Sequence, residues 1–123
     1  MVKGQCLCGQ IQYSYHAEIE SSILCFCQHC KLAQGSIGAW NSPIQLEYFD
    51  IVQGSQYLKS YFHTVLKARV FCSECGSAIY SHRLDLPNII RLRMGTVTEG
   101  AIPVPNESFY NQHKPDFIDC LLR

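Results

Sequence analysis

Residues 25–30 of the chain read Cys25-Phe26-Cys27-Gln28-His29-Cys30. This stretch places three thiols within six residues, and no fourth cysteine follows or precedes it closely. Two cysteine pairs flank it at a distance, in Cys6-Leu7-Cys8 and Cys72-Ser73-Glu74-Cys75. Structural zinc sites are closed by four protein ligands, whereas catalytic sites have three and keep one position for water or substrate. The two pairs together can close one site, and the triad leaves one position open.

The cysteine pattern therefore predicts two zinc ions. The expected ligands of a structural zinc are Cys6, Cys8, Cys72 and Cys75. The expected ligands of a catalytic zinc, which can be labile, are Cys25, Cys27 and Cys30. In extended backbone, residues i and i+2 face the same way, so Cys6 and Cys8 can reach one ion. Gly76 follows the second pair and permits the positive φ that such a turn often needs.

Eight cysteines are also enough for a disulfide framework. The chain, however, is long enough to build its own core, and it has no export signal. Its thiols are spaced C-x-C, C-x-C-x-x-C and C-x-x-C, which in a reducing cytosol is typical of metal ligands. The pair Cys72 and Cys75, taken alone, is also compatible with ordinary buried cysteines.

Three thiolates give a bound Zn²⁺ a net charge of −1, which makes it a weaker Lewis acid than zinc held by neutral histidines. Such an ion is poorly suited to producing hydroxide and well suited to holding a fourth sulfur. A thiol with a pKa near ~8.5 is deprotonated when it coordinates the metal. The triad therefore predicts chemistry on a thiol. The alternative is a second structural zinc, with a fourth ligand from His29, His63, an acidic side chain or Cys120.

The composition excludes some classes of partner. Lys and Arg number 10, as do Asp and Glu, and no basic run is present, so nucleic-acid binding is not favoured. No apolar run approaches the ~20 residues that span a bilayer, and the N-terminal residues lack the apolar segment of a secretory signal. We expect a cytoplasmic protein that binds neither nucleic acid nor membrane, with residues 1–123 forming one domain.

Apolar residues recur mainly with a period of two, which is typical of strands. The expected strands are 10–15, 23–24, 48–52, 57–63, 66–71, 78–80 and 90–94. One helical turn is expected at 31–34, ended by Gly35, and Asn-Ser-Pro at 41–43 is expected to interrupt the structure. The tail is expected to be loop with an edge strand near residues 117–118. Together these features predict a mainly-β fold.

Other side chains carry weaker signals. Cys120 is expected to be a small apolar filler. Arg91 and Arg93 are expected to form a solvated strand face, although they could hold substrate carboxylates. Aromatic residues that could wall a pocket, or simply pack in the core, are Trp40, Tyr57, Tyr61 and Phe62. The histidines at 16, 63, 82 and 113 show no recognisable spacing.

The order of the cysteine motifs resembles the glutathione-dependent formaldehyde-activating enzyme family, which includes centromere protein V. The resemblance covers most of the chain. Its segments are Gly4–Gly9, Cys25–Lys31 with Gly35-Ser36, Phe71–Ser77, Gly95–Val97 and Lys114–Phe117. It implies small twisted antiparallel sheets around zinc, similar to the fold of methionine-R-sulfoxide reductases. It also implies the same division of the seven cysteines into structural and catalytic ligands.

The activity that the resemblance implies is that of a carbon–sulfur lyase, in which the thiol of glutathione adds reversibly to formaldehyde to give S-hydroxymethylglutathione. The chain departs from many members at Phe26, Thr98 and Phe117, where histidine, aspartate and tryptophan are common. These departures concern the choice of thiol and of aldehyde more than the metal sites. Ser36 and His29 are candidates for proton transfer.

Two other classes of function are compatible with the sequence. A zinc-stabilised binding or scaffold module would use the same ligands without turnover. A sulfoxide reductase would need a redox cysteine outside the metal sites, and only Cys120 is available.

Overall fold

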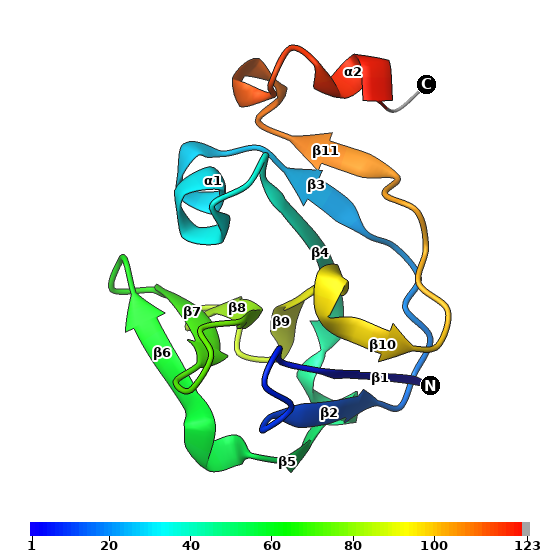
Figure 1. Cartoon of the computed structure of the whole chain (residues 1–123), viewed down its shortest axis with the longest axis vertical. Coiled ribbons are helices and arrows are strands. Elements are labelled where there is room, and N and C mark those ends of the chain that lie inside the picture. Colours follow the sequence, from blue (N-terminus) through cyan, green and yellow to red (C-terminus); the bar gives the residue numbers. More distant parts are fainter. Residues whose placement is uncertain (122–123) are drawn as a thin grey trace.

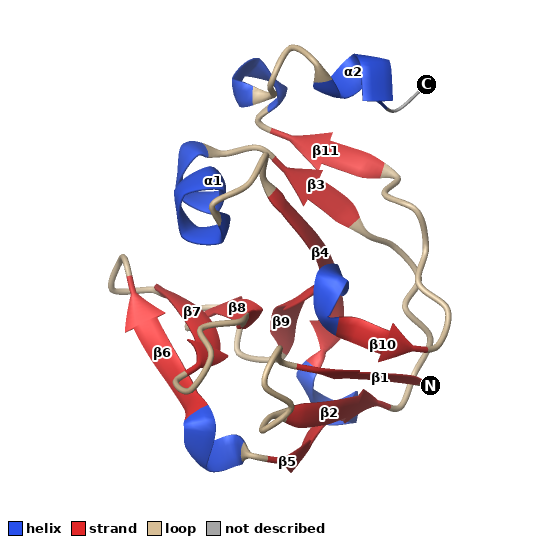
Figure 2. Ribbon diagram, viewed as in Figure 1, coloured by secondary structure: helices blue, strands red, loops and turns tan. Residues whose placement is uncertain are grey.

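Two sheets make up most of the regular structure in residues 1–121, the part of the chain that the computed structural model describes (Figures 1 and 2). The four-stranded sheet has the order β10 (Val97–Glu99), β1 (Val2–Gln5), β2 (Gln12–Tyr15) and β5 (Phe49–Gln53). The seven-stranded sheet has the order β11 (Glu107–Phe109), β3 (Ile23–Cys25), β4 (Ala39–Gln45), β9 (Ile89–Arg93), β8 (Ala78–Arg83), β7 (Lys67–Cys72) and β6 (Leu58–Phe62). The predicted mainly-β class is confirmed.

Helices are short in the described residues. They are α1 (Gln28–Gln34) and α2 (Ile118–Leu121), with single 3-10 turns η1 (Leu46–Tyr48), η2 (Ser55–Tyr57), η3 (Met94–Thr96) and η4 (Asn111–His113). Neither α1 nor α2 is long and apolar enough to cross a membrane.

The period of two located the strands correctly. Each of the seven predicted strands is present, as β2, β3, β5, β6, β7, β8 and β9. Neighbouring strands pair antiparallel, as expected, apart from β11 and β3, which run parallel at one end of the larger sheet (Figure 1). The predicted helical turn is the second half of α1, which ends at Gly35 in left-handed backbone with φ 59°.

Two predictions for the backbone are wrong. Residues 41–43 do not interrupt the structure but lie inside β4. Beyond Asn41 this strand pairs, within residues 1–121, with β9 alone, and proline is tolerated where one edge of a strand is free. Ile118 begins α2 and belongs to no edge strand; the edge strand of the tail is β11, ten residues earlier.

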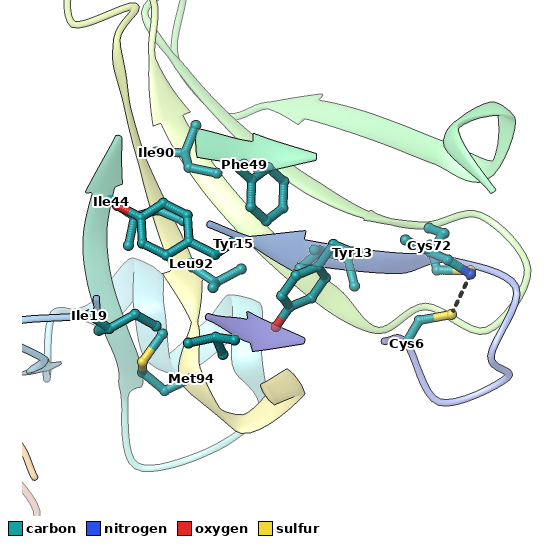
Figure 3. Packing of buried hydrophobic residues seen from close by; sticks show 13 residues of the cluster. Cys6, Tyr13, Tyr15, Ile19, Ile44, Phe49, Cys72, Ile90, Leu92 and Met94 are labelled. Atoms are coloured by element: carbon teal, nitrogen blue, oxygen red, sulfur yellow. Dashed lines mark hydrogen bonds between the residues drawn. The ribbon is translucent and has the colours of Figure 1, made fainter. Parts of the chain in front are cut away.

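The core lies between the sheets (Figure 3). Tyr13 and Tyr15 of β2 face Ile90 and Leu92 of β9, and all four side chains are buried. The Tyr13 ring packs against Phe49 with centroids 5.2 Å apart. Burial of these apolar side chains supplies most of the stabilisation of such a fold.

The Tyr13 ring also lies over Gly4 of β1, its cross-strand partner. The Tyr13 hydroxyl pairs with Thr96 Oγ1 at 2.6 Å, and burial raises the pKa of Tyr13 to about 12. A Cβ on Gly4 would collide with the phenol and with the Thr96 carbonyl. Glycine at this position is therefore required by the close approach of the ring.

We expect Gly4→Ala to lower the free energy of unfolding by about 2 kcal/mol, because the tyrosine must move to admit the methyl group. Urea unfolding monitored by circular dichroism measures the change. Gly95→Ala is the matched control, since no atom lies within 4 Å of the Cβ position there. Equal effects of the two substitutions would contradict this view of the core.

Candidate metal centres

The thiols of Cys6, Cys8, Cys72 and Cys75 converge, with all four Sγ atoms within 4.8 Å of one another. Cys6 Sγ lies 3.5 Å from Cys8 Sγ, and Cys8 Sγ lies 3.8 Å from Cys72 Sγ. Four Zn–S bonds of 2.3 Å at tetrahedral angles would place sulfurs about 3.8 Å apart. The donor set therefore fits a tetrahedral zinc ion.

These four thiols come from the turns of two hairpins, one in each sheet. The first turn joins β1 to β2, and Gly9 N–H donates to the Cys6 carbonyl at 3.1 Å. The second joins β7 to β8, and Gly76 N–H donates to the Cys72 carbonyl at 2.8 Å. Gly76 has φ 83°, as predicted. The prediction of extended backbone at Cys6–Cys8 is wrong, because a tight turn brings these thiols together.

Backbone N–H groups and one hydroxyl surround the sulfurs. Ile11 N–H donates to Cys6 Sγ at 3.3 Å, and Glu74 N–H donates to Cys72 Sγ at 3.4 Å. Ser77 Oγ accepts from Leu7 N–H at 2.9 Å and lies 3.3 Å from Cys75 Sγ, so it links the two turns. Burial opposes ionisation of Cys75, but bonds from Ser77 outweigh it and lower the pKa of Cys75 to about 5. The surroundings of Cys75 therefore favour the thiolate that a metal requires.

The second group of converging thiols is the triad Cys25, Cys27 and Cys30, again within 4.8 Å of one another. Cys25 ends β3, Cys27 is the N-cap of α1, and Cys30 lies in its first turn. Cys30 N–H donates to Cys27 Sγ at 3.2 Å, so one thiol both caps the helix and belongs to the cluster. Within residues 1–121, no fourth His, Cys, Asp or Glu ligand atom joins the triad at this spacing. The donor set fits a metal with one open position.

Without a cation, the triad shares protons unevenly. The Cys30 thiol donates to Cys25 Sγ at 3.4 Å, and this bond lowers the pKa of Cys25 to about 7. The same bond, followed by burial, raises the pKa of Cys30. A divalent cation that binds here must therefore displace a proton, so its affinity falls as pH falls.

All eight cysteines are free. The closest sulfurs, at 3.4 Å, are far beyond the ~2.05 Å of a disulfide bond. Cys120 is exposed and belongs to neither cluster, so the expectation that it fills the core is wrong. It also offers no redox partner beside the triad.

Phe26, between two cysteines of the triad, points into the interior and is 1% exposed. Its backbone N–H donates to the Phe109 carbonyl at 3.0 Å, which extends the parallel pairing of β11 with β3. A Cβ on Gly38 would collide with the Cys25 carbonyl. The backbone around the triad is therefore fixed by β11 on one side and by the close approach of Gly38 on the other.

A cavity of about 580 Å³ opens beside the triad. Its cationic lining residues are Lys67, Arg69, Arg83, Arg91 and Arg93, with four histidines, His29, His63, His82 and His113. No acidic residue of the described chain lines it. Since the chain has 10 Lys and Arg in total, half of them gather at this cavity.

Cross-strand register explains how these charges meet. Arg69 of β7 pairs with Ser81 of β8, which pairs with Arg91 of β9, so the three share one face of the sheet. Lys67 pairs with Arg83 two residues further along. Side chains alternate between faces of a strand, and Ile90 and Leu92, on either side of Arg91, belong to the buried core. Ala68 and His82, which pair with each other, also line the cavity.

The same row continues to the triad. Arg93 follows Arg91 by two residues and pairs with Asn41 of β4, which pairs with Ile23 of β3. Cys25 lies two residues beyond Ile23. The cationic side chains and the first thiol of the triad therefore lie on one face of the seven-stranded sheet.

Arg93 is buried, at 5% exposure, so the expectation of a solvated strand face is wrong for this residue. Its guanidinium donates to Asn41 Oδ1 at 2.7 Å, Gln34 Oε1 at 3.0 Å and Ser81 Oγ at 3.2 Å. Burial lowers the pKa of Arg93 to about 10. It stays cationic at neutral pH, held by neutral acceptors and attracted by the thiols of Cys25 and Cys30.

The sequence analysis named His63 only as an alternative fourth ligand of the triad, but its nitrogens do not join the three thiols at ligand spacing, and it lines the cavity instead. Its ring meets the His29 ring edge-on at 5.3 Å. Its Nδ1 is buried and has no hydrogen-bond partner within residues 1–121. Burial, followed by the charges of Arg69, His29 and Lys67, lowers the pKa of His63. His63 is therefore neutral at pH 7, with one nitrogen free for a ligand.

A second cavity of about 520 Å³ adjoins the first and shares His29, His63, Arg69 and Arg93 with it. Its further lining is largely apolar, with Leu32, Ala33, Tyr61, Val70, Phe71, Ala78 and Tyr80. Of the aromatic residues proposed from the sequence, only Tyr61 lines either cavity. Trp40 and Tyr57 pack against the core, and the proton-transfer candidate Ser36 lines neither cavity.

Comparison with known proteins gives a family and a fold. The model of a family described as "Glutathione-dependent formaldehyde-activating enzyme" matches residues 1–113. A crystal structure of a Rhodobacter sphaeroides protein is similar, with a TM-score of 0.67 and 22% sequence identity over 86% of this chain and 98% of that chain. At this identity the likeness concerns the fold alone. No curated protein matches the chain.

In folded protein that has lost metal from the triad and keeps it at the four-thiol site, we expect iodoacetamide to label Cys25 before Cys30. The Cys25 thiolate is populated above about pH 7 and is lost as the pH falls below that value, because its pKa is lowered. Mass spectrometry of the labelled peptides between pH 6 and pH 9 measures both rates. In denaturant the two rates should become equal; a faster Cys30 in the folded state would contradict the hydrogen-bond assignment.

Proposed function

The chain belongs to the glutathione-dependent formaldehyde-activating enzyme family, and we propose that it is a zinc-dependent carbon–sulfur lyase that adds a thiol reversibly to a small aldehyde. Glutathione and formaldehyde are the substrates that the family suggests. The observation that carries the proposal is a triad of thiols with no fourth protein ligand in residues 1–121, beside a cationic cavity.

We assign different roles to the two groups of thiols. Cys6, Cys8, Cys72 and Cys75 hold a structural zinc, since four sulfurs close its coordination sphere. Cys25, Cys27 and Cys30 would hold a second zinc, which would supply an open coordination position and lower the pKa of a substrate thiol. The sulfur then attacks the carbonyl carbon of the aldehyde. Both groups need free thiolates, so we place the protein in a reducing compartment such as the cytoplasm.

The guanidinium groups of the cavity orient the thiol compound. Arg69 and Arg91 flank Ser81 on the cavity face of the sheet, and Arg93 lies nearest the triad along the same row. Arginine binds carboxylates with paired hydrogen bonds, which fix direction as well as position. These side chains are the proposed partners of the two glutathione carboxylates.

The aldehyde oxygen gains a proton as the carbon–sulfur bond forms. We propose that His63, neutral and with a free Nδ1, takes up the proton that the substrate thiol loses and gives it to this oxygen, with His29 supporting its ring. The histidines contact each other and line both cavities. The adjoining apolar cavity has room for an aldehyde larger than formaldehyde.

The direct test follows exchange between free glutathione and its formaldehyde adduct by NMR. We expect the wild-type protein to accelerate exchange and Cys27→Ala to lose the acceleration, because the triad no longer holds its metal. Cys120→Ser is the matched control, since this exposed cysteine lies outside both clusters. No acceleration by fully zinc-loaded wild-type protein, with glutathione or with simple thiols, would leave a zinc-stabilised binding module as the function.

We expect Cys72→Ala to unfold much of the chain, because metal-binding energy at the four-thiol site is folding energy. Cys27→Ala should keep native dispersion in its NMR spectrum, because the triad lies outside the contact between the two hairpin turns. Far-UV circular dichroism and NMR compare the two variants. If both unfold alike, the division into structural and catalytic thiols is wrong.

A further inference from the structure

The cavity beside the triad holds more positive charge than its own protein partners neutralise. Of its five Lys and Arg side chains, only Arg83 forms an ion pair in residues 1–121, with Asp85 at 2.7 Å. The other four are Lys67, Arg69, Arg91 and Arg93. Arg93 is buried among neutral acceptors. Such charges are stabilised when an anion enters.

The charge of the loaded triad accounts for part of this excess. Three thiolates on Zn²⁺ carry a net charge of −1, and a coordinated substrate thiolate adds another. Two of the four unpaired cations are then balanced. Two remain, and they face a cavity with no acidic residue in the described chain.

The charge of glutathione does not balance the two remaining positive charges of the cavity. Apart from its sulfur, it carries two carboxylates and one ammonium group, so its remaining net charge is −1. The ammonium finds no carboxylate in the cavity lining and meets cations, which repel it most where the local dielectric constant is low. The cavity therefore suits the carboxylates of glutathione and disfavours its amine.

We infer that the preferred thiol of this protein bears at least two negative charges besides its sulfur and no ammonium group. The inference rests on the proposed function for the role of the thiol. The charges can be two carboxylates or one phosphate, since arginine binds both with the same paired geometry. Competing thiols that bear an amine, such as glutathione or cysteine, are then rejected by repulsion of the ammonium group as well as by lost attraction.

The test uses zinc-loaded protein and S-methylated ligands, so that binding is measured without turnover. One pair is S-methylglutathione and S-methyl-glutaryl-cysteinylglycine, which differ only by replacement of the ammonium group with hydrogen. A second pair, S-methyl-4′-phosphopantetheine and S-methylpantetheine, tests phosphate. Isothermal titration calorimetry at low salt gives the affinities.

We expect the glutaryl analogue or the phosphopantetheine to bind about fivefold or more tightly than S-methylglutathione. The advantage should shrink as salt is added. If the glutaryl analogue has the higher affinity, two carboxylates are preferred, and if the phosphopantetheine has it, a phosphate is preferred. If S-methylglutathione binds as tightly as both anionic analogues, the inference is overturned.

Two variants locate the effect. Arg91→Gln should bring the affinity ratio of the first pair toward one, because it removes a cation from the cavity face. Lys59→Gln, on exposed β6 outside the cavity lining, should leave the ratio unchanged. NMR spectra check that both variants are folded. A ratio unaffected by Arg91→Gln would place the selectivity elsewhere and contradict the inference.

The two proposals fail separately. A preference for the dianion in a protein that accelerates no thiol–aldehyde exchange would remove the lyase function and keep the anion site. Accelerated exchange with glutathione and no preference among the ligand pairs would keep the lyase function and remove the inferred preference for a dianionic thiol.

Discussion

The contact between two hairpin turns, made through four sulfurs, is the constraint on which the rest of the structure depends. One turn joins β1 to β2 in the smaller sheet and the other joins β7 to β8 in the larger. Cys6 and Cys72 are buried at the edge of the core, beside the side chains that pack the sheets together (Figure 3). A metal held by these four thiols would tie the two sheets together at this end, and it would thereby position β7, β8 and β9.

Those three strands have two different faces, and the difference makes a binding site possible. One face carries Ile90 and Leu92, which belong to the core between the sheets. The other carries arginines that would repel one another in a closed interior. They are tolerated because the cavity admits solvent and because the triad lies on the same face. The thiols of Cys25 and Cys30 stabilise the charge of Arg93, so the triad and the cationic cavity support each other electrostatically.

Sequence spacing predicted the features that depend on nearby residues. The C-x-x-C pair with Gly76, the grouping of the triad, the end of α1 at Gly35 and the period-two strands all follow from contacts within a few positions. Features that depend on pairing between distant strands were not predicted. Nothing local indicates that Arg69 and Arg91 lie in one row across Ser81, or that His63 reaches His29. The prediction that Pro43 interrupts the structure was wrong for the same reason, since the neighbouring strands decide whether a strand has a free edge.

The central claim is that seven sulfurs divide into a closed set of four and an open set of three. X-ray absorption at the zinc edge, on protein loaded with two zinc ions, counts sulfur ligands directly. The account predicts an average of about 3.5 sulfurs per zinc, with the remainder light atoms, rising to about four when a substrate thiol is added. Four sulfurs per zinc before any thiol is added, or no change on its addition, would contradict it.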